Sequence, residues 1–431
     1  MAEITKGETH DGGLKIAEEK TNNIPDLKKR IETASPQNIS EFLEIILGGA
    51  INLGASDIHV EPEEARAKLR IRIDGILEDL ATIDYKIYEN LLSRIKLLSG
   101  IKFNVTDRPQ DGRFTVISKG IAIEIRTSTL PAEHGESIVL RILNPKSLID
   151  LEALGLREDL FSLFKQEIKK PNGMIIVTGP TGSGKTTTLY AFLKKINNPE
   201  IKIITIEDPI EYHIKGISQT QVNPVKGYDF ANGLQSIMRQ DPDVILVGEI
   251  RDPKTCQIAL QAALTGHLVF TTLHTNDAAG TIARLTSLEG DLVNIGPAVN
   301  LAVAQRLVRK VCKKCSKLVP ASDKDLLKLK EGLKKLPKNV KIPKITKGTK
   351  IPQIKGCKEC NFTGYKGRLG IFEAILIDDE MEKFILKNPS MADFKEEAIK
   401  KDMVPMYQDG LIKVLEGLTT IEEVERITGE R

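Results

Sequence analysis

The sequence contains no tryptophan, only 4% aromatic residues, and five cysteines among its 431 residues. So few rings leave little with which to stack nucleic-acid bases. No stretch approaches 18 consecutive apolar residues, and the start, Met1 to Lys6, lacks the apolar core of a signal peptide. We therefore expect a protein that is made and kept in the cytoplasm, with no transmembrane segment.

The charge is nearly balanced over the whole chain but unevenly placed. The formal net charge is +3, yet Ser316–Gly356 holds twelve lysines against three acidic residues, which makes this insert +9 and leaves the rest of the chain at −6. Because the basicity is local, a general affinity for nucleic acid is not indicated. The length suits two or three domains, each able to bury its own core.

The first 39 residues are polar, with scattered apolar positions, and we expect a flexible leader with one marginal helix at Ile24–Thr33. Residues 40–146 are predicted to form a small, arginine-rich α+β domain, with a hairpin turn at Asp74-Gly75 and a helix at Tyr85–Ser99. Its strands are expected at Ser56–Glu61, Lys68–Asp74, Arg113–Ile117, Ile121–Thr127 and Ser137–Ile142.

Residues 147–305 alternate apolar strands with helical segments, which predicts a largely parallel sheet with helices on both faces. Ligands of such α/β sheets bind at the carboxyl ends of the strands. The strands are expected at Met174–Thr178, Lys202–Ile206, Val244–Gly248 and Leu268–Leu273.

A complete phosphate-binding loop, Gly-Pro-Thr-Gly-Ser-Gly-Lys-Thr, follows the first of these strands and precedes a helix. Its backbone N–H groups and the helix N-terminus suit phosphates. Lys185 is expected to bridge the β- and γ-phosphates, and the Thr186 hydroxyl to hold Mg²⁺. The loop predicts a nucleoside triphosphatase. The predicted nucleotide-binding residues are Gly179, Pro180, Thr181, Gly182, Ser183, Gly184, Lys185, Thr186 and Thr187.

Carboxylates and histidines follow or flank the other strands. Glu207 and Glu211 come after one strand, and one or the other is predicted to serve the metal shell, while Glu249 follows the next strand and is predicted to orient the attacking water. His267 and His274 bracket a further strand. A histidine near the γ-phosphate can sense hydrolysis, which is the role predicted for both.

Four of the five cysteines form two Cys-x-x-Cys pairs, Cys312 with Cys315 and Cys357 with Cys360. Four thiolates suit tetrahedral Zn²⁺ without an open coordination position. The alternative is four reduced cysteines without a metal. We expect residues 306–373 to form a zinc-knuckle subdomain that contains the lysine-rich insert, and residues 374–431 to form a helical C-terminal subdomain.

These motifs together resemble the ATPases of type II secretion and type IV pilus assembly, from about Ser40 to the C-terminus. The resemblance rests on the phosphate loop, the acidic box Glu207–Glu211, the signature Met238–Asp252, the histidine box Thr265–His274 and the paired cysteines. In the small domain, Ala55–Pro62 and Leu69–Gly75 also match the family.

The resemblance implies a RecA-like core, a PAS-like small domain and a homo-hexameric ring that binds ATP between subunits. It implies that Glu249 is the catalytic glutamate, with Arg113 and Arg126 as arginine fingers. It further implies an inner-membrane platform protein as partner, at the inner face of the cytoplasmic membrane. Larger members carry a further N-terminal domain that docks on this platform, where this chain has about forty residues, so the sequence does not predict that docking route.

The sequence predicts a motor that extends a type IV pilus or a type II secretion pseudopilus, since retraction motors generally lack the metal knuckles. Three alternatives stay open: a retraction motor, a RecA-like nucleic-acid translocase that uses the +9 insert, and a nucleotide-gated scaffold with little hydrolysis.

Overall fold

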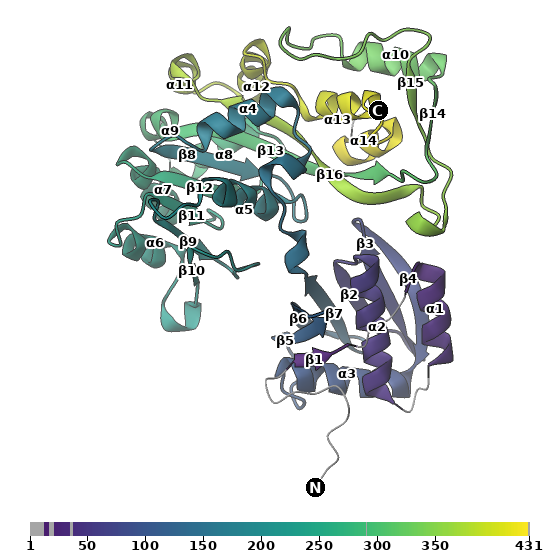
Figure 1. The fold of residues 1–431 in the computed structure, drawn as a ribbon. Coiled ribbons are helices and arrows are strands. Elements are labelled where there is room, and N and C mark those ends of the chain that lie inside the picture. Colours follow the sequence, from purple (N-terminus) through teal and green to yellow (C-terminus); the bar gives the residue numbers. More distant parts are fainter. Residues whose placement is uncertain (1–12, 17–20, 35–37, 290, 430–431) are drawn as a thin grey trace. The chain divides into compact units, whose positions relative to one another are not determined.

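The computed structural model describes residues 13–16, 21–34, 38–289 and 291–429, which form two compact units (Figure 1). The first unit holds the described residues up to Ser147 together with Cys312–Ser316 and Ile354–Gly367. The second holds the described residues of Leu148–Val311, Lys317–Gln353 and the chain from Arg368 onward.

The first unit is a seven-stranded sheet in the order β1-β5-β6-β7-β2-β3-β4, antiparallel except for the β1–β5 pair. Its strands alternate as predicted: Leu69 and Ile71 are buried in the core beneath the helices, whereas Arg70 and Arg72 are half-buried. The predicted turn is confirmed, because Asp74 and Gly75 both have positive φ, as the tight hairpin between β3 and β4 requires. The elements are β1 (Gly13–Lys15), α1 (Ile24–Thr33), α2 (Ile39–Leu53), β2 (Asp57–Pro62), β3 (Arg66–Ile73), β4 (Ile76–Asp84), α3 (Tyr85–Ser99), β5 (Gln110–Ser118), β6 (Ile121–Ala132) and β7 (Gly135–Leu143).

The expected flexible leader over the first 39 residues does not fit the residues that the structure describes in this segment. Strand β1 pairs with β5, and helix α1 buries Ile24, Leu27 and Ile31 against the core. Leu27 packs on the backbone of Gly49 in α2 so closely that a Cβ there would lie 2.2 Å from a Leu27 methyl carbon. Three apolar residues on one face of α1 are enough to pack the helix against the core. Because the segment as a whole is polar, its composition does not reveal this apolar face. Residues 1–12, 17–20 and 35–37 lie outside the described residues.

The second unit contains a sheet in the order β10-β9-β11-β12-β8-β13-β16, with parallel pairing from β10 through β13. Alternate residues of its strands enter two separate cores, one on each face: Ile176 and Ile206 join one core, and Val177 and Phe270 the other. The predicted parallel sheet with helices on both faces is therefore confirmed. The elements are α4 (Glu158–Glu167), β8 (Gly173–Thr178), α5 (Lys185–Ile196), β9 (Ile203–Glu207), β10 (Ser218–Gln221), α6 (Phe230–Met238), β11 (Val244–Val247), α7 (Pro253–Leu264), β12 (Leu268–Leu273), α8 (Ala279–Glu289), α9 (Leu292–Ala298), β13 (Val299–Val311) and β16 (Tyr365–Leu376).

The predicted boundary at residue 305 differs from the structure, because β13 runs on to Val311 and β16 is a further strand of the same sheet. Both strands place residues in the cores on the two faces, so they belong to the sheet and not to a separate subdomain. The lysine-rich insert forms a two-stranded antiparallel sheet and, between its strands in the sequence, the helix α10. Leu329 of α10 packs with Leu411 and Val424 of the C-terminal helices. These elements are β14 (Lys317–Pro320), α10 (Asp323–Gly332), β15 (Lys350–Gln353), α11 (Asp379–Ile385), α12 (Met391–Lys400), α13 (Met406–Leu415) and α14 (Ile421–Thr428).

Among the described residues, none of the helices has both the length and the apolar character that a membrane span requires.

Candidate functional site

The phosphate loop joins β8 to α5 at the carboxyl end of the sheet. Gly179 and Gly184 have φ of 147° and 90°, and a Cβ on either would lie within 2.8 Å of Gln305 on the neighbouring strand β13. Only glycine fits both the conformation and the space. The Lys185 ammonium folds back over the loop and donates to the carbonyl oxygens of Gly179 at 2.8 Å and Pro180 at 3.2 Å.

Two observations fit this loop to an anionic group. The Ser183 hydroxyl is buried and has no hydrogen-bond partner among the described residues. Burial lowers the pKa of Lys185, an effect that the nearby Glu249 opposes. A phosphate placed against the first turn of α5 would accept from Ser183 and restore a counter-charge to Lys185, so the loop suits the phosphates of a nucleotide.

Glu249 and His274 come together beside this loop. They follow the neighbouring strands β11 and β12, and β12 pairs with β8. The mostly buried Glu249 carboxylate places Oε2 3.4 Å from Nε2 of His274 and Oε1 2.6 Å from Nη2 of Arg251. Burial and Lys185 lower the pKa of His274, while Glu249 opposes them. Lys185, Glu249 and His274 thus lie close to one another at the carboxyl edge of the sheet.

Glu207 differs from its predicted role in the metal shell. It ends β9 as expected, but its buried carboxylate accepts from the hydroxyls of Tyr190 and Thr205 and from the Gln219 amide. Burial raises its pKa. These three donors occupy both carboxylate oxygens, so Glu207 anchors α5 to the sheet. Glu211 lies half-buried in the loop beyond β9 and remains the predicted metal-shell carboxylate.

His267 is the second site residue whose predicted role the structure does not support. It precedes β12, so it lies at the amino edge of the sheet, where its Nδ1 is 3.1 Å from the Ala262 carbonyl oxygen. His274 lies beyond the other end of the strand, and six extended residues span about 20 Å. Two histidines that bracket a strand are on opposite edges of a sheet, so within the chain only His274 reaches the loop.

Two buried residues of β13 and β16, which were not predicted from the sequence, form hydrogen bonds with segments next to the phosphate loop and His274. Gln305 of β13 accepts a 2.6 Å hydrogen bond from Thr188 of α5, and Glu373 of β16 accepts from the backbone N–H of Ala278, just beyond His274. Each is a buried polar residue next to an apolar run of its strand: Gln305 follows Leu301–Ala304, and Glu373 lies between Phe372 and Ala374. Because buried polar groups need partners, that pattern is the signal that could have found them.

Arg113 and Arg126 belong to the first unit, where they are cross-strand neighbours on β5 and β6. Arg126 also pairs in register with Arg141, which pairs with Asp57. Arg126 is 3.1 Å from the Glu124 carboxylate, whereas Arg113 is 4.0 Å away with a 73% exposed side chain. The arginines therefore form a row across the sheet, in which Arg113 is the most accessible to a ligand.

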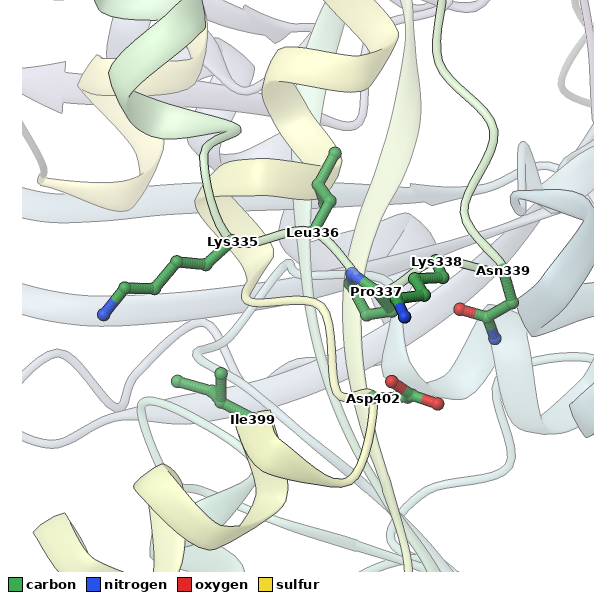
Figure 2. A pocket seen from close by; sticks show the side chains of 7 residues that line it. All are labelled: Lys335, Leu336, Pro337, Lys338, Asn339, Ile399 and Asp402. Atoms are coloured by element: carbon green, nitrogen blue, oxygen red, sulfur yellow. The ribbon is translucent and has the colours of Figure 1, made fainter.

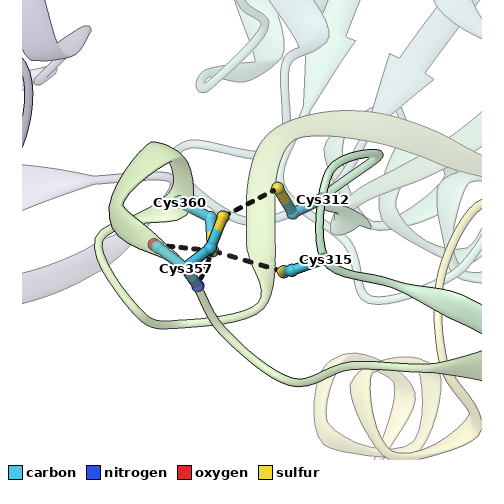
Figure 3. Close-up of side chains that lie close together, drawn as sticks. All are labelled: Cys312, Cys315, Cys357 and Cys360. Atoms are coloured by element: carbon cyan, nitrogen blue, oxygen red, sulfur yellow. Dashed lines mark hydrogen bonds between the residues drawn. The ribbon is translucent and has the colours of Figure 1, made fainter.

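The four paired cysteines gather in one cluster (Figure 3), and all four Sγ atoms lie within 4.8 Å of one another. Three of the Sγ–Sγ distances are 3.7, 3.7 and 3.9 Å. A tetrahedron with metal–sulfur bonds of about 2.3 Å has edges of about 3.8 Å. Burial alone would raise the pKa of Cys360, but the backbone N–H groups of Cys357 and Gly364 lower it to about 7. The cluster can hold a metal ion.

The cysteine cluster belongs to the same compact unit as the small domain, whereas Lys317–Gln353 of the insert between its two pairs belong to the second unit. In the first unit, the N–H of Gly367 donates to Asp74 in the β3–β4 turn at 2.8 Å. The N–H of Ile24 donates to Asn361, next to Cys360, at 2.7 Å. The expected zinc-knuckle subdomain is therefore divided, because its cysteines belong to the first unit while its insert belongs to the second.

An open hollow of about 450 Å³ lies between the insert and the end of α12 (Figure 2). It contains none of the residues of the phosphate loop, so it is distinct from the nucleotide site. Its lining residues are Lys335, Leu336, Pro337, Lys338, Asn339, Ile399 and Asp402.

Comparison with known proteins gives a consistent result. The sequence profile of the family described as Type II/IV secretion system protein matches residues 32–426. The chain is 41% identical to the Type II secretion system ATPase E of Vibrio cholerae, over 98% of this chain and 81% of that protein. It is 42% identical to the Type IV pilus assembly ATPase PilB of Thermus thermophilus, over 91% of this chain and 44% of that protein.

A solved structure is also similar, that of the pilus retraction motor PilT with bound ADP. The TM-score is 0.58 at 27% identity, over 88% of this chain and 95% of that one. The predicted RecA-like architecture and family are thereby confirmed. The chain belongs to the Type II/IV secretion system protein family and is an ATPase of the secretion and pilus motor type.

Proposed function

We propose that this ATPase drives the extension of a type IV pilus or a type II secretion pseudopilus. The observation that carries the proposal is the convergence of Lys185, Glu249 and His274 at the phosphate loop, in a chain about 40% identical to a secretion ATPase and a pilus assembly ATPase. A glycine-rich loop suited to phosphate and a carboxylate beside it are the parts that nucleotide hydrolysis needs.

In the proposed reaction, residues Gly179–Thr187 bind the phosphates of ATP and Lys185 contacts the β- and γ-phosphates. Mg²⁺, when bound, neutralises charge on the phosphate oxygens, and Thr186 with Glu211 is the pair that would hold it. Glu249 accepts the hydrogen bond of the attacking water and orients it in line with the γ-phosphoryl group. His274 contacts Glu249 and carries the change at the γ-phosphate into the loop beyond β12.

Arg113 and Arg126 are proposed to complete the site from the small domain of a neighbouring subunit in a homo-hexameric ring. Within the chain they belong to a different compact unit from the phosphate loop, and Arg113 is largely exposed. A guanidinium that arrives only when the small domain closes would stabilise charge developing on the γ-phosphoryl oxygens. Hydrolysis would then be tied to domain movement, which is the mechanical output.

The cysteine cluster is proposed to bind Zn²⁺, as a structural site closed by four thiolates. The Sγ separations suit tetrahedral sulfur coordination, and two backbone N–H groups already face Cys360. We further propose that the motor acts at the inner face of the cytoplasmic membrane, on an inner-membrane platform protein.

The direction of the motor is tested in a host strain that lacks this gene and is complemented with the wild type or with Glu249→Gln. If the motor drives extension, the wild type should restore filaments or secretion, and Glu249→Gln should not. Filaments that persist without the gene but fail to retract would identify a retraction motor. Strongly salt-dependent stimulation of ATP turnover by DNA would instead favour the nucleic-acid translocase.

A further inference from the structure

Glu373 is a buried carboxylate in the middle of an apolar strand. It lies on β16, is 3% exposed, and is flanked by Phe372 and Ala374, both of which enter the hydrophobic core. Burial raises its pKa, against the effect of two backbone N–H groups that donate to it. A carboxylate is costly to bury, so its two hydrogen bonds must hold parts of the chain that the neighbouring apolar residues cannot.

The two hydrogen bonds of Glu373 join two different segments. Oε1 accepts from the N–H of Ala278 at 2.8 Å, and Oε2 accepts from the N–H of Met406 at 3.0 Å. Ala278 ends the loop that begins with His274, and Met406 is the first residue of α13. One side chain thus ties the His274 loop to the start of a C-terminal helix.

The same loop is held from its other end by the strand that carries the phosphate loop. The N–H of Thr275 donates to the hydroxyl of Thr178, the last residue of β8, at 2.8 Å. The C-terminal subdomain adds a second contact, because Lys395 of α12 lies 3.4 Å from the carboxylate of Asp277. The His274 loop is therefore hydrogen-bonded to the phosphate-binding strand and ion-paired with a C-terminal helix.

We propose that Glu373 is a positioning residue for ATP hydrolysis, which holds the His274 loop so that the imidazole faces Glu249 and links that loop to α13. The hydrogen bonds of Glu373 come from the backbone of Ala278 and Met406, so its proposed effect on the site passes through the backbone of Ala278. Movement at the nucleotide would pass along this connection to the C-terminal helices. The inference rests on the proposed role of His274.

The test is the steady-state ATPase activity of the full chain carrying Glu373→Gln. The amide keeps the shape of the side chain but presents an NH₂ group to one of the two N–H donors, so one hydrogen bond is lost. A displaced catalytic loop lowers kcat by about 10- to 100-fold. The KM for ATP should stay within about twofold, because Lys185 and its loop are untouched. Glu373→Asp, which keeps the charge but withdraws the carboxylate, should also lower kcat.

Glu423→Gln is the matched control. Glu423 is a fully buried carboxylate that ties α14 to β13 through Arg309, and its ion pairs are with Arg309 and Arg426, neither of which lies in the His274 loop. Glu423→Gln should lower the melting temperature, as we also expect for Glu373→Gln, but should leave the kcat of the folded protein unchanged. Equal losses of kcat in both variants, or wild-type kcat in either folded Glu373 variant, would overturn the proposal.

A double variant separates this inference from the role of His274. If Glu373 acts through His274, Glu373→Gln should lower kcat little further in a His274→Asn background. Effects that multiply would overturn the inference and leave the role of His274 intact. Wild-type kcat in His274→Asn alone would overturn the role proposed for His274 and, with it, the path assigned to Glu373.

Discussion

The Glu249 carboxylate lies 3.4 Å from Nε2 of His274, although 24 residues and a helix separate the two positions in the sequence. Neighbouring parallel strands bring them together, since β11 and β12 end at the same edge of the sheet. The residue proposed to orient the attacking water is therefore in contact with the residue proposed to report hydrolysis.

The contact makes ATP hydrolysis sensitive to pH. Burial and Lys185 hold the pKa of His274 below its ordinary 6.5, so the imidazole is neutral near pH 7. As the pH falls through the lowered pKa, the imidazolium forms an ion pair with the Glu249 carboxylate and competes with the attacking water for it. We expect kcat to fall by up to about tenfold between about pH 7 and pH 5.5. His274→Asn should flatten that fall, and a profile identical to the wild type would contradict the contact's role.

The exposed arginine of the small domain gives a second prediction. Arg113→Ala should lower kcat by on the order of 10²-fold, because the charge at the γ-phosphoryl group loses its external partner. ATP binding by the phosphate loop should be unchanged. Arg66→Ala is the control, since Arg66 is a similarly exposed arginine of the same sheet, 3.9 Å from Asp84. Equal activity of the two variants would show that Arg113 is only a surface residue.

The sequence predicts well those parts of the site that depend on local pattern. The phosphate loop has a fixed spacing, and its strands are apolar runs buried on both faces, so their ends could be aligned without the structure. Glu249 and His274 follow such strands directly. That position alone placed both at the carboxyl edge.

The errors come from features that the one-dimensional pattern does not contain. Glu207 also ends a strand, but its side chain turns toward Tyr190 of α5, and no local signal shows that direction. His267 is the exception, because its position before β12 is visible in the sequence and already places it at the edge opposite the phosphate loop. Glu373 reaches Ala278 across 95 residues of sequence, a contact that only the fold creates.

The cysteine cluster predicts one metal ion per chain. Metal analysis of the purified wild type should find about one zinc per chain, and the double change Cys312→Ser with Cys315→Ser should abolish it. Because the cluster packs with the small domain through Asp74, the double variant should also be cleaved faster by protease near Ile354–Gly367. A wild-type protein that contains no zinc would rule out the proposed site.

Substitution within a buried ion cluster should cause a large loss of stability, although the cluster has no proposed role in catalysis. Asp409 is fully buried and lies 2.6 Å from Arg157 and 2.9 Å from Lys413. Asp409→Asn removes the carboxylate partner of Lys413 and leaves Arg157 with only the partly exposed Asp159, so it should lower the free energy of unfolding by about 3–5 kcal/mol. Asp159→Asn removes the partly exposed second partner of Arg157 and should cost about 1 kcal/mol or less. Denaturant unfolding distinguishes the two, and similar losses would contradict this assignment.

The most direct test of the central claim is the turnover of Glu249→Gln measured beside its affinity for ATP. If Glu249 orients and deprotonates the attacking water, kcat should fall by about 10²- to 10⁴-fold. ATP should still bind with near wild-type affinity, because the phosphate loop and Lys185 are unchanged. Turnover in Glu249→Gln equal to that of the wild type would contradict the account, since the carboxylate beside His274 would then take no part in hydrolysis.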